Sequence, residues 1–249
     1  MAASKTRRNG RKSAKTKPGE GANRRRAKRG TGEKRIVAAA AKFFAEHGFR
    51  APTRGLARRL GVTQALLYRY FPSKRSLIER TFETVFIADW DPRLTQRLLD
   101  PSAPLRDRLV EFYIDFTRRS TPIRTRLFIR AGLDHQGLAN RYVFPLNNRI
   151  LTPVISALRQ AAGLPSPEAK PILRAERELA MTLHGAISHL HIRKNVHKAP
   201  LPDDLGTHVA FYVECFLDGA LTTIARLHEQ PPPRFLGQRL GNRRGEPIE

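Results

Sequence analysis

The segment 61–74, GVTQALLYRYFPSK, gathers several side chains that can bind nucleic acid. Gln64 can form two hydrogen bonds with the edge of an adenine, and Arg69 can reach a guanine or a phosphate. The phenolic hydroxyls of Tyr68 and Tyr70 can donate to phosphate oxygens. Such chemistry, crowded into one short segment, predicts contact with DNA.

Turn and capping residues predict that these side chains stand on a short helix. Gly61 makes a turn, Thr63 can accept a hydrogen bond from an orphan N–H, and Pro72 ends the segment. The resulting helix covers about residues 63–71, and a second short helix precedes it. Two helices of this size and turn, spanning about residues 52–71, are typical of a helix-turn-helix, whose second helix lies in the major groove.

Plainer interpretations of the same side chains remain open. Tyr68 and Tyr70 can be surface aromatics, and Gln64 can be a solvated residue of a first helical turn. Leu66, which we expect on the exposed side, can touch thymine methyl groups. The residues that we predict to contact DNA are Arg54, Thr63, Gln64, Ala65, Leu66, Tyr68, Arg69, Tyr70 and Lys74.

The distribution of charge favours a polyanionic partner for the N-terminal third. The chain of 249 residues has a net charge of +24. Residues 1–30 hold 12 Lys or Arg and one acid, residues 31–80 hold 11 and three, and the remainder holds 23 and 18. Because neutralised phosphates release counterions, so basic a region favours DNA. For residues 1–30 alone, a tail that merely keeps the protein soluble is the alternative.

Composition also gives expectations for the cellular compartment and for the structure of the two chain ends. The single cysteine, Cys215, excludes an internal disulfide and is compatible with a reducing cytosol, and we expect it to be buried in the last helix. No apolar run approaches the ~18 residues of a membrane span, so we expect no membrane contact. We expect residues 1–31 to form a disordered basic arm and residues 230–249 to form a disordered tail.

Residues 32–82 carry an ordered set of short motifs. They are Phe43-Phe44, Gly48-Phe49, Leu56-Ala57, Gly61-Val62-Thr63, Leu67-Tyr68, Tyr70-Phe71 and Ser73-Lys74-Arg75. In this order they resemble the DNA-binding domain of TetR-family transcriptional regulators. The resemblance implies a cytoplasmic, nucleoid-associated bacterial homodimer that binds a palindromic operator in double-stranded DNA. It also implies a small-molecule effector in the C-terminal domain, a four-helix dimer bundle made by the last two helices, and no cofactor.

Three features depart from the family pattern. Ala51-Pro52 stands where the family often has two threonines, so Arg54 is the candidate for the phosphate contact there. Leu66 replaces a small or hydroxyl residue, which makes a base contact at that position apolar. The arm of residues 1–31 is longer than usual, and we interpret it as a clamp on phosphates or on the minor groove.

Apolar residues at helical spacing continue through the rest of the chain, and no strand pattern interrupts them. We therefore expect an all-α protein with a helix-turn-helix domain over residues 32–88. A helical effector-binding and dimerisation domain should follow over residues 89–229. Within it, a longer helix near residues 140–162 is disturbed by Pro145 and Pro153.

The C-terminal domain offers weaker site candidates. We predict ligand contacts from Phe112, Phe116, Phe128, Leu183 and His184, and a dimer interface from Val209, Tyr212, Phe216, Ala220 and Ile224. His184 and His191 are seven residues apart and share a helix face, which can suit a metal. No carboxylate or cysteine stands at ligand spacing, however, so we expect pocket lining or interface packing and no metal.

Two classes of function fit these features. The first is a sequence-specific, ligand-responsive transcriptional regulator, usually a repressor, that releases its operator when an effector binds. The second is a sequence-tolerant DNA-coating protein in which the basic arm dominates and no effector exists. An enzyme is a poor third interpretation, because the chain has no Gly-rich phosphate loop, nucleophile elbow or metal-ligand pair of standard spacing.

Overall fold

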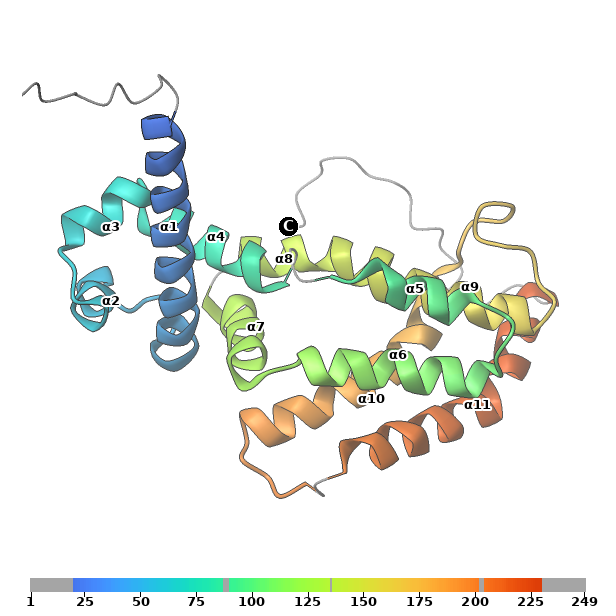
Figure 1. Cartoon of the computed structure of the whole chain (residues 1–249). Coiled ribbons are helices and arrows are strands. Elements are labelled where there is room, and N and C mark those ends of the chain that lie inside the picture. Colours follow the sequence, from blue (N-terminus) through green and yellow to red (C-terminus); the bar gives the residue numbers. More distant parts are fainter. Residues whose placement is uncertain (1–19, 87–89, 135, 202–203, 230–249) are drawn as a thin grey trace, which may run out of the picture.

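The computed structural model describes residues 20–86, 90–134, 136–201 and 204–229. These residues form eleven α-helices and one π-helical turn with no strand among them, so the predicted all-α class is confirmed. Figure 1 shows a head of short helices at one end of an elongated bundle. The elements are α1 (Glu20–His47), α2 (Thr53–Leu60), α3 (Gln64–Tyr70), α4 (Lys74–Phe86), α5 (Pro92–Leu99), α6 (Leu105–Arg119), α7 (Pro122–Asp134), α8 (Gln136–Leu146), η1 (Asn147–Leu151), α9 (Thr152–Ala161), α10 (Arg174–Asn195) and α11 (Leu205–Glu229).

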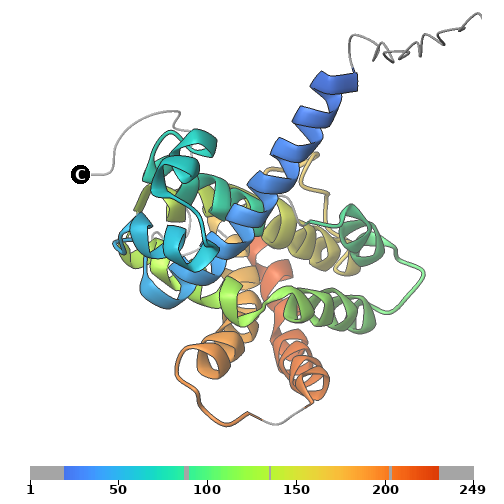
Figure 2. The ribbon, with the colours of Figure 1, turned by 60° about the vertical axis from the view of Figure 1, so that its left-hand side comes forward.

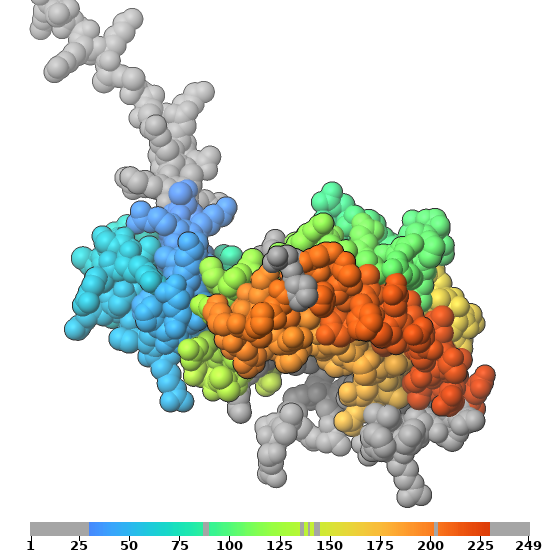
Figure 3. Space-filling model, turned by 90° about the horizontal axis from the view of Figure 1, so that it is seen from below, coloured from blue at the N-terminus to red at the C-terminus, as the bar shows by residue number. Residues whose placement is uncertain are grey.

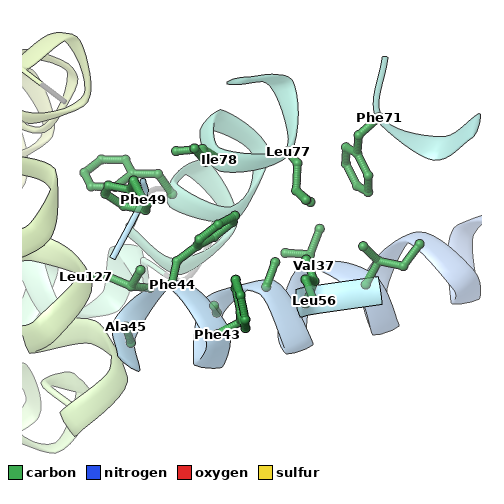
Figure 4. Close-up of a cluster of buried hydrophobic side chains, with 14 of the residues drawn as sticks. Val37, Phe43, Phe44, Ala45, Phe49, Leu56, Phe71, Leu77, Ile78 and Leu127 are labelled. Atoms are coloured by element: carbon green, nitrogen blue, oxygen red, sulfur yellow. The ribbon is translucent and has the colours of Figure 1, made fainter. Parts of the chain in front are cut away.

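Helices α1 to α4 form the head, and one apolar cluster holds them together. Along α1, apolar side chains recur three or four residues apart, which gives this helix a buried face. Phe44 of α1 and Leu56 of α2 are fully buried in the cluster, and Leu77 brings in α4 (Figure 4). The rings of Phe43 and Phe44 meet edge to face with 5.6 Å between their centroids, a favoured aromatic geometry that helps to fix the packing.

Helix α1 begins well before the predicted limit of order. It starts at Glu20, so the expected disorder is wrong for residues 20–31. Arg, Lys and Ala are good helix formers, and lengthening an existing helix needs no new nucleus, so the basic run continues α1 despite its glycines. Figure 2 shows this end of α1 projecting away from the other helices. Residues 1–19 and the predicted tail 230–249 lie outside the described residues.

Helix α7 belongs to both halves of the molecule. Its residues Leu127 and Ala131 are buried in the head cluster, and Figure 4 shows Leu127 beside the phenylalanines of the head. Asp134, at the end of α7, accepts a hydrogen bond of 3.2 Å from the backbone N–H of Phe49. A division between residues 88 and 89 therefore does not separate two independent cores, because α7 follows that division and packs into the head.

The remaining helices enclose a second apolar cluster, to which α5, α6, α9, α10 and α11 all contribute. Helices α8 and α9 are joined through the π-helical turn at residues 147–151 without a break in the helical backbone. Pro145 and Pro153 flank that turn, as expected where missing backbone donors disturb a helix. Helix α5 has no counterpart among our expectations. It begins where the Asp91 carboxylate accepts a bond of 3.1 Å from the Arg93 N–H.

A buried ionic cluster fastens the loop of residues 162–173 to the end of α11. Arg159 and Glu176 have fully buried side chains, and Nη2 of Arg159 lies 2.6 Å from Oε2 of Glu176. The same guanidinium donates to three backbone carbonyls of the loop. Nε2 of His228, near the end of α11, lies 3.1 Å from Oε1 of Glu176. Burial acts to raise the pKa of Glu176, but the hydrogen bonds from Arg159, the Leu173 N–H and His228 together hold it below its usual value.

We expect Glu176→Gln to lower the free energy of unfolding by about 3–5 kcal/mol, because it leaves the buried Arg159 without a counter-ion. Urea unfolding followed by circular dichroism measures this loss. Glu178→Gln, on the exposed side of the same helix, is the matched control and should leave the unfolding midpoint unchanged. Equal unfolding curves for the two variants would show that the ion pair contributes no stability.

The same pair makes the stability depend on pH. Because the folded-state pKa of Glu176 is lowered, its contribution is present above the unfolded-state pKa. It is lost as the pH falls through the folded-state pKa. As the pH falls through this range, the free energy of unfolding should therefore decrease more steeply for the wild type than for Glu176→Gln.

Candidate nucleic-acid interface

A tight turn joins α2 to α3. Gly61 ends α2 with a φ of 66°, in the left-handed region that side chains disfavour, and its N–H bonds to the Arg58 carbonyl. Thr63 then caps α3, where its hydroxyl accepts a hydrogen bond of 3.2 Å from the Leu66 N–H. The predicted Gly61 turn and Thr63 cap are both confirmed.

Helix α3 is anchored on one face and open on the other. Leu67 is only 2% exposed and packs into the head cluster, and Phe71 closes the same face. Ala65, Tyr68 and Arg69 are exposed on the opposite side. Figure 1 places α3 at the outer end of the head, away from the bundle. A duplex can therefore approach this side of α3 without contact with the bundle.

Gln64 and Tyr68 are held by one hydroxyl of α2. Nε2 of Gln64 donates to Oγ1 of Thr53 at 2.9 Å, and the phenolic oxygen of Tyr68 lies 3.1 Å from the same atom. Thr53 is buried, so its hydroxyl has a fixed position between the two helices of the motif. The hydrogen bond with Thr53 and then that with Gln64 lower the pKa of Tyr68 below its usual value. Both side chains are thus oriented before any partner arrives.

Thr53 was missed by the sequence prediction. It was absent from the predicted contacts because it stands 11 residues before Gln64, in another helix. The available signal was a hydroxyl residue directly after Pro52 at the start of α2. That position is one of the few from which a short side chain can reach across to α3.

Two side chains that were predicted to contact DNA interact with other parts of the protein. Tyr70 is half-buried, and its hydroxyl lies so near Gly32 of α1 that a side chain at position 32 would collide with it. Nζ of Lys74 donates to the Arg50 carbonyl at 2.9 Å, which leaves two ammonium hydrogens for other acceptors. Leu66 is half-buried and not fully exposed. Phosphate contact by Tyr70 or Lys74 stays a prediction, but both residues also stabilise the head.

Several cations around α3 are available to an anion. Arg54, Arg58 and Arg69 are exposed and have no ion-pair or hydrogen-bond partner within the described part of the chain. Arg59 differs, because its guanidinium pairs with Glu46 at 2.7 Å. The exposed surface around α3 therefore combines oriented polar side chains with free positive charge.

Comparison with known proteins agrees with this geometry. Residues 36–81 match the family model described as bacterial regulatory proteins, tetR family. The nucleoid occlusion factor SlmA of Idiomarina loihiensis is 31% identical over 140 residues, which cover 54% of this chain and 69% of that relative. The chain belongs to the TetR family. SlmA of Marinobacter nauticus is 56% identical over 36 residues, but this match covers only 14% of the chain and 18% of that relative.

Solved structures support the TetR fold over most of the chain. A TetR-family transcriptional regulator from Mesorhizobium loti aligns with a TM-score of 0.55 at 15% identity, covering 76% of this chain and 96% of that one. A TetR-like regulator from Rhodococcus sp. aligns with a TM-score of 0.54 at 17% identity, covering 76% and 95%. At such low identity these likenesses concern the fold alone.

The predicted effector residues of this TetR-family chain fall into three places. Phe116, Phe128 and His184 line one pocket of about 410 Å³ between α4, α6, α7 and α10. Phe112 instead lines an adjoining cavity of about 20 Å³. Leu183 is 2% exposed in the bundle core and lines neither space. The structure thus brings three of the five residues together.

The predicted dimer residues are mostly on the wrong side of α11. Val209, Ala220 and Ile224 are buried inside their own chain, so they cannot form an outer interface. Tyr212 and Phe216 are half-buried and pack against the same core. Cys215 is exposed, and the expectation that it is buried is therefore wrong. The apolar repeat along α11 marks the face that packs on α6 and α10.

Metal binding and membrane crossing are two further possibilities for the described residues. No three His, Cys, Asp or Glu side chains within these residues meet in an arrangement that could hold a metal ion. None of the helices in the described ranges has the length and apolar character needed to cross a bilayer.

We expect Thr53→Val to raise the pKa of Tyr68 back toward its usual value, because the hydroxyl that lowers it is removed while the side chain keeps its shape. Titration of phenolate absorbance in this TetR-family protein measures the change. Tyr68→Phe identifies the contribution of that one tyrosine by subtraction. An unchanged Tyr68 titration in Thr53→Val would show that the shared hydroxyl does not orient the side chain.

Proposed function

We propose that this protein is a sequence-specific regulator of transcription that binds operator DNA as a homodimer. A small molecule bound in the pocket beside α7 releases the operator, so that the protein acts as a repressor. The observation that carries the proposal is the surface of α3, where Thr53 orients Gln64 and Tyr68 next to the free cation of Arg69. In the proposed complex, α3 lies in the major groove and α2 braces it.

Each polar side chain has a separate role in the proposed complex. Gln64 still offers its carbonyl oxygen and a second amide hydrogen to a base edge while it donates to Thr53. Arg69 contacts a guanine or a nearby phosphate. Arg54 and Tyr68 contact phosphates, which fix the register of the helix on the duplex.

An uncovered helical face supports the proposed dimer. Figure 3 shows α10 and α11 side by side on one face of the bundle, with no other helix over them. Exposed residues recur at helical spacing along α11, at Phe211, Cys215, Gly219 and Thr222, and Thr182 is exposed on α10. Phe211 is a large apolar side chain that is 60% exposed. Pairing two such faces would bury it and would produce a four-helix interface.

The position of α7 supports coupling between ligand and DNA. Phe128 of α7 and Phe86 of α4 line the same pocket, with 6.3 Å between their ring centroids. Leu127, the neighbour of Phe128, is buried in the head. A ligand that moves these walls therefore has different affinities for different head positions, and that difference can weaken operator binding. The two α3 helices of a dimer must lie ~34–36 Å apart to enter successive major grooves.

A second candidate function is binding along the nucleoid with little sequence preference. Two observations favour it: the matched relatives carry the name nucleoid occlusion factor, and residues 1–30 hold 12 Lys or Arg. Affinity would then come mainly from phosphate neutralisation and would fall steeply with salt. The ratio of specific to non-specific affinity separates the two candidates.

We expect Gln64→Ala to reduce the preference for operator over random DNA by about 1–3 kcal/mol, the usual value of one bidentate base contact. Fluorescence anisotropy with both DNAs measures the ratio. Arg54→Ala is the contrasting variant and should weaken both complexes alike, with a smaller salt slope. Thr53→Val is the second control, because it keeps the Gln64 amide and removes only the hydroxyl that orients it. An equal loss on both DNAs for Gln64→Ala would contradict base recognition.

We expect Phe211→Asp to convert the dimer to monomers and to abolish tight operator binding, because two charges would face each other across the interface. Sedimentation velocity measures the association state. Leu133→Asp, at an apolar side chain of α7 that is 73% exposed, is the matched control and should stay dimeric. A persistent dimer for Phe211→Asp would exclude this face as the interface.

Removal of residues 1–19, which hold seven Lys or Arg, should flatten the salt dependence of DNA binding. Each lost phosphate contact lowers the logarithmic slope by about 0.9. For the proposed regulator, the preferred sequence should stay the same, because α3 selects it. Loss of all measurable binding at moderate salt would instead favour the second candidate.

A further inference from the structure

The pocket beside α7 has the size and walls of a small-molecule site. Its volume is about 410 Å³, within the range of about 300–1,000 Å³ that is usual for such sites. Most of the wall is apolar and comes from Phe86, Phe116, Phe128, Leu146, Met181 and Ile192. Three of these side chains are aromatic rings, so the walls suit a flat, ring-shaped occupant.

Two buried histidines bring polar atoms into this apolar site, and a third, His189, lines it from an exposed position. His184 and His191 line the pocket from α10, and each residue is 5% exposed. Nδ1 of His184 and Nε2 of His191 have no hydrogen-bond partner within the described residues. Nε2 of His184 lies 3.2 Å from the Ser188 hydroxyl, which leaves Nδ1 as its open position. Buried polar atoms in native proteins are rarely left unpaired, so these two point to a bound polar group.

The ring of Phe116 lies close to both imidazoles. Its centroid is 5.0 Å from that of His184 and 6.1 Å from that of His191. An occupant stacked beside Phe116 would therefore bring its ring edge within reach of either histidine. The pocket thus offers hydrogen-bonding atoms at two positions along its aromatic wall, one at each histidine.

The charges around the pocket argue against a cationic occupant. No Asp or Glu lines it, so a cation would lose its water shell without a counter-charge. Burial lowers the pKa of His184 to about 4, and burial with the charge of Lys194 lowers that of His191 to about 4. Both imidazoles are therefore neutral near pH 7, and each can donate one hydrogen bond and accept one. Arg124 also lines the pocket, and its guanidinium lies over the Phe86 ring, 5.1 Å from its centroid. An anion beside Arg124 is therefore the competing occupant that the probes below must exclude.

We propose that this pocket binds an uncharged aromatic molecule whose hydroxyl or carbonyl oxygen hydrogen-bonds to His184 or His191. The proposal rests on the proposed function, because it takes this pocket as the effector site, and it names the chemical class of that effector. A phenol satisfies the site with few atoms: its ring lies between the phenylalanines, and its oxygen both donates and accepts. The occupant touches Phe86 and Phe128, the side chains that join the pocket to the head.

Four probes of similar size test the chemical class. Naphthol is neutral and carries a hydroxyl, methylnaphthalene replaces the hydroxyl by a methyl group, naphthoate is an anion, and naphthylmethylammonium is a cation. Calorimetric titration of the full-length protein at neutral pH, without DNA, measures each affinity. We expect naphthol to bind about 10-fold more tightly than methylnaphthalene and than either ion. Tighter binding of naphthoate, or equal binding of all four probes, overturns the proposal.

Variants test whether the histidines supply the polar contact. His184→Leu or His191→Leu, whichever removes the contact, should abolish the preference for naphthol over methylnaphthalene, while methylnaphthalene still binds. Retained methylnaphthalene binding also shows that the pocket is folded. His197→Leu, at an exposed histidine outside the pocket, should keep the wild-type preference. If a pocket variant loses both probes, Ser188→Ala offers a milder change at the same site. An undiminished naphthol preference in every folded pocket variant overturns the assignment.

Operator release is measured separately, so that the two proposals can fail independently. If naphthol binds with the expected histidine dependence but leaves the operator complex intact, the chemical class stands and ligand-responsive release fails. If naphthol shows no specific binding while the protein still selects its operator, the chemical class fails and sequence-specific DNA binding stands.

Discussion

Helix α7 is packed on two sides, and this constraint ties the DNA-binding head to the bundle. One side places Leu127 and Ala131 in the head cluster, and the other lines the pocket through Thr125 and Phe128. The end of α10 also holds α7 on the pocket side, since Nδ2 of Asn195 donates to the Thr125 hydroxyl at 3.0 Å. Close-packed interiors shift between discrete arrangements and do not deform smoothly. In the proposed regulator, a displaced pocket wall would therefore shift the head.

The helix-turn-helix could be predicted because its signals are local. A left-handed Gly61, the Thr63 cap and the apolar Leu67 each act within a few residues of chain, and each is where the sequence placed it. The family motifs extend the same local logic across the first four helices. The N-terminal limit of α1 was missed for the opposite reason. A basic composition without an apolar repeat suggested disorder, but the strong helix formers in residues 20–31 outweigh that tendency.

What could not be predicted depends on contacts between distant segments. An amphipathic repeat shows that α11 has a buried face, but it does not say whether that face meets its own chain or a second copy. Val209 and Ile224 pack against their own chain, whereas Phe211 and Cys215 are exposed on the other side of the helix. The brace at Thr53 is of the same type, since only folding brings it against α3. Distinguishing the two faces of α11 needs the positions of α6 and α10.

The recognition surface divides its polar side chains into held and free ones, and the two kinds have different energetic roles. Gln64 and Tyr68 are already restrained by Thr53, so little side-chain entropy is lost when they meet a base or phosphate. Such preset groups discriminate well, because a wrong partner cannot be accommodated by a small rotation. Exposed arginines such as Arg54 keep their freedom and act at longer range, where they attract any duplex. In the proposed complex, specificity therefore depends on the Thr53 hydroxyl beneath α3, and the encounter rate depends on the exposed arginines around it.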